Sequence, residues 1–261
     1  MKSFLVIFLI VITYWLSEGY IAKSKYLGGL KTLHKKEQEY YYGLEGERVN
    51  WPKGHPVRGI DVSRYQPQVN WPKVRIGNIS FAFMKATEGF YRLDPLFGEH
   101  WEKSREVGLV RGAYHFFRPD QPAWLQAINF MRIVKLEAGD LPPVLDVEQV
   151  GGQSAEELRG GIKTWLNLVE QRYSAKPILY TNYHFYQRYL AGHFEGYPLW
   201  IAHYKVPRLR LNSRSGSKVS FWQHTDRGKV AGIKGRVDCN VFFGSLADLK
   251  KLSLKADTGL L

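Results

Sequence analysis

The sequence predicts an α/β protein, namely an irregular TIM-like (β/α) barrel with a degenerate C-terminal third. From about residue 59 onward, short apolar runs alternate with longer amphipathic segments, which is the pattern of repeated βα units. Eight such runs are present, the number of strands in a closed barrel of this type. The length of 261 residues also fits, because single α/β barrels commonly need ~250 residues.

The predicted strands are short and largely apolar, as expected for parallel strands that are buried on both faces. They cover residues 59–62, 79–85, 110–116, 143–148, 177–181, 199–203, 219–223 and 236–242. Successive strand ends at Ser63, Thr87, Phe116, Glu148 and Asn182 are 24, 29, 32 and 34 residues apart. These intervals leave room for a crossover helix in each unit.

Three amphipathic segments predict helices over residues 97–107, 122–137 and 155–173. The last of these begins with a capping box, because Glu157 follows Ser154 by three residues. After Asn182 the spacing shrinks, with 19 residues from Tyr204 to Gln223 and 15 from Gln223 to Asp238. A parallel crossover needs about a dozen residues or more. We therefore expect hairpins to replace helices in the last third.

The N-terminal region divides into two segments ahead of the barrel domain, which we place at residues 59–261. Residues 1–19 are predicted to be a signal peptide or a membrane anchor, since Lys2 precedes an apolar stretch over residues 4–16 that is too short for a comfortable membrane span. Residues 20–58 read as a linker or accessory segment. The body is therefore expected outside the cytoplasm: secreted, periplasmic or anchored to the envelope through residues 4–16.

The formal charge of +13 comes from 37 basic and 24 acidic residues. Such a charge attracts polyanions, but no nucleic-acid-binding motif is visible, so we expect no nucleic-acid partner. Membrane contact is expected only through the N-terminal hydrophobic segment, and the protein is expected to be a monomer. The single cysteine, Cys239, is expected to be a small buried apolar side chain.

Asp146 and Glu148 follow a short apolar run and carry the strongest functional signal. Side chains alternate along a strand, so these two acids are expected on one side and Val147 on the other. Burial and mutual repulsion should raise the proton affinity of at least one of them. One protonated acid beside one carboxylate is the arrangement that glycoside hydrolysis requires. A structural ion pair or a helix N-cap is the alternative explanation.

Barrel enzymes build their sites at the carboxyl ends of strands, and those ends are acidic and aromatic here. Asp61 and Asp238 are two further candidate acids, although Asp61 also suits a turn cap and Asp238 a buried hydrogen-bond hub. Lys85 and Glu88 are expected to pair structurally. The candidate substrate-binding residues are Tyr114, Tyr180, Trp200, Tyr204, Trp222, Gln223 and Asn240. Trp200, Tyr204 and Trp222 suit either sugar stacking or the core, and His115 suits packing.

Six ordered motifs give the chain a close resemblance to the glycoside hydrolase family 25 lysozymes, the N-acetylmuramidases of the Chalaropsis type. The motifs lie within about residues 59–245. They are Gly-Ile-Asp-Val-Ser with Tyr65-Gln66, Lys85-Ala-Thr-Glu-Gly, Gly112-Ala-Tyr-His-Phe, Leu145-Asp-Val-Glu, Leu199-Trp-Ile-Ala with Tyr204, and Trp222-Gln223 leading to Val237-Asp-Cys-Asn. His224 departs from this pattern, because relatives often have an aromatic residue after Trp-Gln.

The resemblance implies cleavage of the β-1,4 bond between N-acetylmuramic acid and N-acetylglucosamine in peptidoglycan glycan strands, with net retention of configuration. It implies no cofactor and no metal. By position, Glu148 matches the general acid/base and Asp146 its partner carboxylate, with Asp61 and Asp238 completing the acidic cluster. A covalent glycosyl-enzyme and attack by the substrate's own acetamido oxygen both stay open as mechanisms.

Three alternatives compete with this interpretation. The four acids could hold a metal ion in a phosphodiesterase or amidohydrolase. A chitinase-like glycosidase also ends a strand in spaced acids. A peptidoglycan-binding envelope protein could keep the groove while having little or no catalytic activity.

Overall fold

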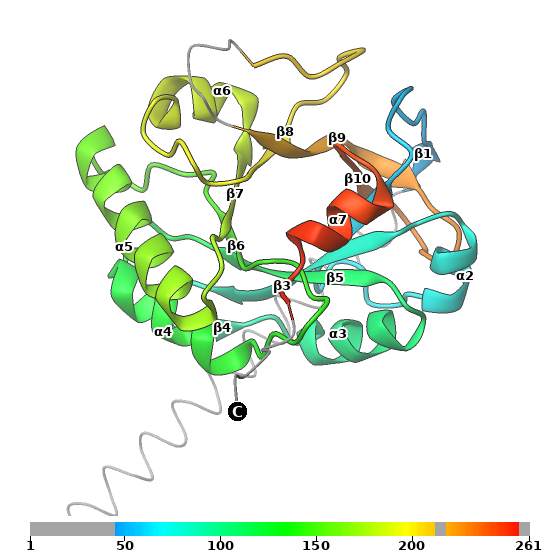
Figure 1. The fold of residues 1–261 in the computed structure, drawn as a ribbon, viewed down its shortest axis with the longest axis horizontal. Helices are drawn as coiled ribbons and strands as arrows, with labels where there is room; N and C mark the ends of the chain where they lie inside the picture. The colour runs from blue at the N-terminus through cyan, green and yellow to red at the C-terminus, as the bar shows by residue number, and fades with distance from the viewer. Residues whose placement is uncertain (1–44, 212–217, 256–261) are drawn as a thin grey trace, which may run out of the picture.

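The computed structural model describes residues 45–211 and 218–255, and all eight predicted strands are present in it. They are β2 (Arg58–Val62), β3 (Phe81–Glu88), β5 (Val110–Phe116), β6 (Val144–Asp146), β7 (Ile178–Asn182), β8 (Leu199–Ala202), β9 (Val219–Lys229) and β10 (Val237–Phe242). They form a closed barrel (Figure 1). Two short strands lie outside it: β1 (Glu47–Arg48) pairs with β9, and β4 (Arg92–Leu93) pairs with β3.

The barrel follows the sheet order β9-β10-β2-β3-β5-β6-β7-β8 and closes through pairing of β8 with β9. All neighbouring pairs from β2 through β8 to β9 are parallel. In contrast, β10 is antiparallel to both β9 and β2. The predicted irregular last third is therefore confirmed, since the short connection from β9 to β10 makes a hairpin in place of a βα unit. The expected hairpin between Tyr204 and Gln223 is wrong, because β8 and β9 are parallel.

Helices α2 (Trp71–Ile76), α3 (Phe97–Glu106), α4 (Ala123–Ile133) and α5 (Ala155–Tyr173) surround the barrel (Figure 1). The α5 bounds and its Ser154–Glu157 capping box agree with the prediction. The predicted end of α4 at residue 137 is wrong, because Val134 is already extended and buried. Between β7 and β8 the chain forms α6 (Tyr183–Phe185) and the single π-helical turn η1 (Tyr186–Leu190).

Aromatic side chains fill the barrel interior. Phe83 stacks on Trp200 with ring centroids 4.4 Å apart, and Phe221 packs edge-on to Phe83 at 5.1 Å. Gly112 makes room for this cluster, because a Cβ there would lie 2.5 Å from the Phe83 ring. When a large side chain fills the space beside a glycine, the interior of a closed barrel reaches the packing density of a protein core. The barrel interior is therefore closely packed and can support a site above it.

Helix α7 (Leu246–Leu252) covers the end of the barrel where the strands begin. Leu249 packs into the interior cluster with Val57 and Leu141, which precede β2 and β6. The Leu254 amide donates to the Asp140 carbonyl at 2.8 Å and fixes the segment after the helix. The opposite end, where the strands finish, is left for the site.

Residues 45–58 lie against the barrel, with β1 beside β9 in parallel register. Figure 1 shows α2 to α5 grouped around the other strands, while β1 lies near β9 and β10. Val49 and Trp51 pack on the hydrophobic core from this side. This segment therefore covers apolar surface where the hairpin has replaced a helix. The division of the chain at residue 58, between accessory segment and barrel domain, stays a prediction.

The predicted leader over residues 1–19, and residues 20–44, lie outside the described residues. Within the part of the chain that is described, no helix is both long and apolar enough to cross a membrane. Cys239 is fully buried, as expected, and it contributes to the core between the sheet and its outer layer.

Candidate active site

A pocket of about 250 Å³ opens at the carboxyl ends of the strands. Each of the eight barrel strands contributes to its lining. The four predicted acids all line it, together with five of the seven predicted substrate-binding residues. The lining consists of Asp61, Val62, Ser63, Tyr65, Gln66, Lys85, Tyr114, Phe116, Asp146, Glu148, Tyr180, Trp200, Tyr204, Gln223, Asp226, Arg236 and Asp238.

Asp146 and Glu148 both line this pocket, but they differ in secondary structure and in exposure to solvent. Strand β6 ends at Asp146, so the predicted continuation of the strand to Glu148 is wrong. The Val147 amide donates to the Tyr180 carbonyl at 2.9 Å, and Glu148, the next residue, lines the pocket. Asp146 is only 6% exposed, whereas Glu148 lies at the open mouth and is exposed to solvent.

The Asp146 carboxyl has an incomplete set of hydrogen bonds. Its Oδ1 atom is buried and has no hydrogen-bond partner among the described residues. Asp146 makes no ion pair in this part of the chain either, because nearby Lys85 pairs with Glu88 at 2.8 Å. The structural alternatives for Asp146, an ion pair or an N-cap, therefore have no support. A buried acceptor without a donor is costly and is expected to meet one in a ligand.

The surroundings favour protonation of both acids. Burial raises the pKa of Asp146 well above its usual range, the Glu148 charge raises it further, and the Lys85 ammonium opposes the rise. Desolvation of the Glu148 carboxyl by the pocket also raises its pKa, against a hydrogen bond from Tyr180 that lowers it. Because water reaches Glu148, we expect the smaller rise there. A charge on Glu148 disfavours a charge on Asp146, so we expect the pair to hold one proton.

Asp61 and Asp238 form a second pair across β2 and β10. They are register partners, and a hydrogen bond joins their carboxyl groups. Asp61 Oδ2 also accepts from Gln223 Nε2 at 2.9 Å and from Asn240 Nδ2 at 2.7 Å. Burial raises the pKa of both acids, and the Asp61 charge raises that of Asp238 further. Asp61 thus has donors for its charged form, while Asp238 carries the shared proton.

The Gln223 side chain connects the two acid pairs. Its Oε1 atom accepts from the Tyr180 hydroxyl at 2.8 Å and from the Tyr204 hydroxyl, while its Nε2 atom donates to Asp61. The Tyr180 hydroxyl also lies within hydrogen-bonding reach of Glu148. A phenol has one proton to donate, so Tyr180 can serve Gln223 or Glu148 but not both at once.

The aromatic residues take different places in the pocket. Trp200 is its floor, since it is 2% exposed, stacks on Phe83 and donates from Nε1 to Asn240 Oδ1 at 2.8 Å. Tyr204 is 37% exposed at the rim, where a sugar ring can reach it. Tyr114 lines the wall beside the acids.

His115 faces away from the pocket, as strand alternation predicts. It is fully buried, lies 2.7 Å from Thr87 Oγ1 and 3.1 Å from Gln126 Oε1, and stacks on Trp165. Burial lowers the pKa of His115 to about 4. The expected role as a packing histidine is confirmed.

Two predicted substrate-binding residues do not line the pocket. Trp222 precedes the inward-facing Gln223 on β9, so it points to the outer face, where Nε1 donates to the His203 carbonyl. Asn240 is fully buried beneath Asp61 and acts as its donor. Neither residue therefore lines this pocket, and substrate contact by Trp222 or Asn240 stays a prediction. His224 also lies outside this pocket, so it cannot alter a sugar contact within it.

Several lining residues were not predicted as site residues. Tyr65 and Gln66 belong to the first of the six motifs, which was a usable signal. Asp226 and Arg236 come from the β9–β10 hairpin, and β9 continues to Lys229, six residues past its predicted end. No feature of the sequence indicated that extension. The described residues contain no group of three or more His, Cys, Asp or Glu placed to hold a metal ion.

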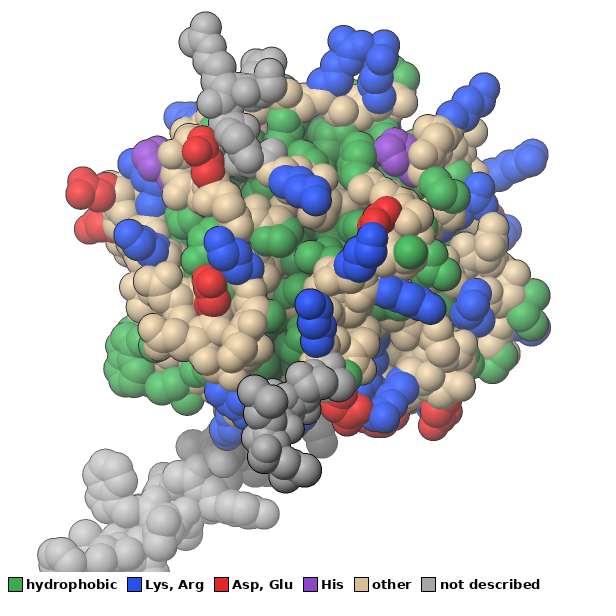
Figure 2. Space-filling view, in the orientation of Figure 1, with side chains coloured by type: hydrophobic (Ala, Val, Ile, Leu, Met, Phe, Trp, Pro, Cys, Tyr) green, Lys and Arg blue, Asp and Glu red, His purple; other side chains and the backbone are tan. Residues whose placement is uncertain are grey.

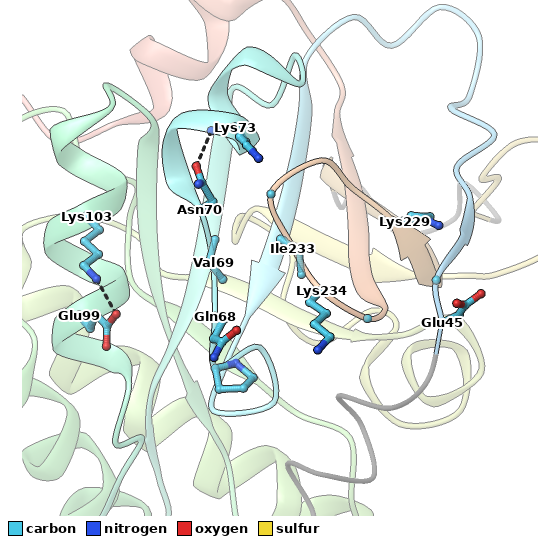
Figure 3. Close-up of a pocket in the computed structure, with 14 residues that line it drawn as sticks. Glu45, Gln68, Val69, Asn70, Lys73, Glu99, Lys103, Lys229, Ile233 and Lys234 are labelled. Carbon is cyan, nitrogen blue, oxygen red and sulfur yellow. Dashed lines mark hydrogen bonds and ion pairs between the residues drawn. The ribbon is translucent and has the colours of Figure 1, made fainter.

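A larger cavity of about 930 Å³ lies beside this pocket, between the segment after β2 and the hairpin loop (Figure 3). Two of its polar side chains pair with each other, since Lys103 donates to Glu99 at 2.6 Å, and the Asn70 side chain caps α2. The acid pair is absent from its lining. Size alone therefore does not identify the site, and the smaller pocket is the one with the chemistry.

Comparison with known proteins points to one group. The family model described as Glycosyl hydrolases family 25 matches residues 60–233. The chain is 44% identical over 223 residues to the uncharacterized protein YegX of Escherichia coli O6:H1, across 82% of this chain and 81% of that protein. It is 33% identical over 215 residues to lysozyme M1 of Streptomyces globisporus, across 76% of this chain and 71% of that protein. The crystal structure of the bacterial lysozyme from Streptomyces coelicolor matches with a TM-score of 0.71 and 32% identity, across 77% of this chain and 98% of that one.

Proposed function

Because the chain belongs to glycosyl hydrolase family 25 and is a glycoside hydrolase of the lysozyme type, we propose that it cleaves the β-1,4 bond between N-acetylmuramic acid and N-acetylglucosamine in peptidoglycan. The observation that carries the proposal is the meeting of Asp146 and Glu148 in one pocket with unequal burial. Two carboxyl groups in different surroundings can divide the roles of proton donor and charge stabiliser.

Glu148 is the general acid/base of this proposal. Its position at the pocket mouth lets it reach a bound glycosidic oxygen, and its raised pKa favours the protonated form. Glu148 gives its proton to the leaving oxygen as the bond from that oxygen to the anomeric carbon breaks. The resulting carboxylate then takes a proton from the attacking water, which restores the acid for the next cycle.

Asp146 stabilises the acetamido group of the N-acetylmuramic acid unit. Its orphan Oδ1 atom accepts a hydrogen bond from the acetamido N–H, while the acetamido oxygen attacks the anomeric carbon. This bond favours the charged form of Asp146, so the proton shared by the acid pair moves to Glu148. Attack by the acetamido oxygen and then by water inverts the carbon twice, which gives net retention.

Asp61 and Asp238 keep the far side of the pocket acidic and rigid. Gln223 contacts both Asp61 and the Tyr180 hydroxyl and so positions that hydroxyl. A hydrogen bond from Tyr180 lowers the pKa of Glu148. Tyr114, Tyr204 and Trp200 provide the apolar surfaces that a sugar ring needs. Peptidoglycan lies outside the cytoplasm, so the protein acts there.

The proposal is tested by incubating purified, insoluble peptidoglycan with the wild-type protein and with Glu148→Gln. New reducing ends should appear only with the wild type, and excess EDTA should not prevent their release. Chitin should yield few new reducing ends. Peptidoglycan whose N-acetylmuramic acid units have been de-N-acetylated should also resist cleavage, since the acetamido nucleophile is then missing. Equal cleavage of acetylated and deacetylated material would exclude the acetamido mechanism.

A further inference from the structure

A second groove, which we call the basic groove, lies on the outer face of β9. Its volume is about 640 Å³. One wall comes from the accessory segment, one from the segment after β8, and the floor from β9. The lining consists of Glu47, Arg48, Val49, Asn50, Trp51, Pro52, Lys53, Lys205, Val206, Pro207, Arg208, Trp222, His224, Thr225, Arg227 and Gly228.

The charge of the basic groove is strongly positive. Five basic side chains, Arg48, Lys53, Lys205, Arg208 and Arg227, line it with a single acid, Glu47. Arg227 pairs with that acid at 3.6 Å, and the other four cations have no ion-pair partner within the described residues. Figure 2 shows Lys and Arg side chains gathered at the upper right, over the region of β1. Such a concave cluster attracts an anionic ligand.

The floor of the basic groove contains an unsatisfied histidine. His224 is 8% exposed, and its Nε2 atom has no hydrogen-bond partner among the described residues. Burial lowers the pKa of His224 to about 4, so the ring is neutral and Nε2 offers one hydrogen-bonding position. Trp51 and Trp222 hold the ring edge-on at 5.3 and 5.8 Å. A fixed polar atom left unpaired in a buried floor indicates a ligand partner.

Trp51 adds an aromatic surface to the groove. It is partly exposed, lines the groove and is oriented by Arg58, which lies 5.0 Å from the ring centroid. An indole beside a polar hydrogen-bonding group is a common platform for a sugar ring, because the flat apolar face of the sugar packs on the ring. Together with the cations, this arrangement suits a saccharide that carries carboxylates.

The basic groove is separate from the catalytic pocket. Trp222 and His224 flank Gln223 on β9, and side chains alternate along a strand, so the groove lies on the opposite face of the strand from the acids. Arg48, Trp51 and Lys53 also precede residues 60–233, the part that matches the family model. The groove therefore depends on the accessory segment of this chain.

We propose that the basic groove is a second binding site, which takes a peptidoglycan disaccharide bearing an acidic stem peptide. The indole and His224 contact the sugar, and the cations pair with the carboxylates of the stem. This inference rests on the proposed function for the identity of the polymer. Occupation of the groove holds the enzyme on insoluble wall material while the pocket cleaves another part of it.

The test measures binding of a soluble N-acetylglucosamine–N-acetylmuramic acid disaccharide that bears an acidic stem peptide. Binding of the same disaccharide without the peptide is measured in parallel. The protein used for these measurements is the Glu148→Gln variant, and binding is followed by tryptophan fluorescence and calorimetry. Adding Lys53→Glu and Arg208→Glu should weaken binding of the peptide-bearing probe about tenfold, since each exposed ion pair contributes up to about 1 kcal/mol. The matched control, Lys163→Glu with Lys250→Glu on α5 and α7, should change it less than twofold.

A second variant tests the role of His224 in the floor of the basic groove without changing the charge of the groove. His224→Phe keeps a ring in the same place and should weaken binding roughly three- to tenfold through the lost hydrogen bond. Equal loss in the Lys163/Lys250 control, or unchanged binding in both groove variants, would overturn the inference. In an otherwise wild-type chain, Lys53→Glu with Arg208→Glu should leave turnover of a short soluble glycan unchanged while slowing digestion of insoluble peptidoglycan. Absent turnover in the wild type would instead count against the proposed function.

Discussion

Asp61 lies directly opposite Asp238 in the antiparallel register of β2 and β10, and a hydrogen bond joins the two carboxyl groups. Two carboxylates cannot donate to one another, so one member of the pair carries a proton. Gln223 and Asn240 donate to Asp61, which favours the charged form there and leaves the proton on Asp238. The pair is thus half neutralised within a buried acidic site.

Asp238→Asn should make folding stability less dependent on pH. Burial raises the pKa of Asp238 in the folded state, so the folded protein binds this proton more tightly than the unfolded chain. The contribution of such a group to stability is greatest at acid pH and falls as pH rises through the raised pKa. The amide keeps the hydrogen bond to Asp61 without titrating. The melting temperature of the variant should exceed that of the wild type at neutral pH, with a flatter profile from about pH 4 to pH 8. An unchanged slope would contradict this assignment of the proton.

Glu148→Gln should lower kcat by about 10²- to 10⁴-fold, because the leaving oxygen loses its proton donor. Glu148 is exposed at the pocket mouth, so the free energy of unfolding should change by less than about 0.5 kcal/mol. Turnover on peptidoglycan and thermal unfolding measure the two effects separately. A folded variant with wild-type turnover would remove Glu148 from the mechanism.

Asp146→Asn should abolish most turnover without loss of stability at neutral pH. The substitution removes a buried acid whose charged form is disfavoured, and it keeps the shape of the side chain. It also replaces a carboxylate by a neutral amide, which cannot stabilise a charge developing on the acetamido group. Turnover and chemical denaturation at pH 7 provide the check, and a loss of both activity and stability would indicate a structural role for Asp146.

Tyr180→Phe should shift the alkaline limb of the kcat profile to higher pH. The Tyr180 hydrogen bond lowers the pKa of Glu148, so its removal should raise that pKa and keep the general acid protonated over a wider range. The matched control is Tyr197→Phe, whose hydroxyl donates to Glu170 away from the pocket. If both variants keep the wild-type profile, the Tyr180 hydroxyl does not adjust Glu148.

Much of the barrel follows from local sequence pattern. Eight apolar runs predicted eight strands because each is buried on both faces. The short interval from Gln223 to Asp238 predicted the hairpin because it leaves little room for a crossover helix. The acids were recognisable because charged side chains at the ends of apolar strands are rare without a function. These features depend on neighbours close in sequence.

The remaining features depend on tertiary contacts. In Trp222-Gln223 only one side chain can face the pocket, and the sequence does not say which; the pairing of β9 with β8 and β10 decides it. Asn240 was predicted to bind substrate, yet it lies below Asp61, in hydrogen-bonding contact with Trp200. The position of residues 45–58 was not predictable, because it depends on the outer face of β9 that lacks a helix of its own.

Muramidase activity is tested most directly by mass spectrometry of peptidoglycan fragments that the wild-type protein releases and that are then reduced with borohydride. We expect products that end in reduced N-acetylmuramic acid, formed with the wild type and absent with Glu148→Gln. Products that end in reduced N-acetylglucosamine, or no released fragments from a folded wild-type protein, would contradict it.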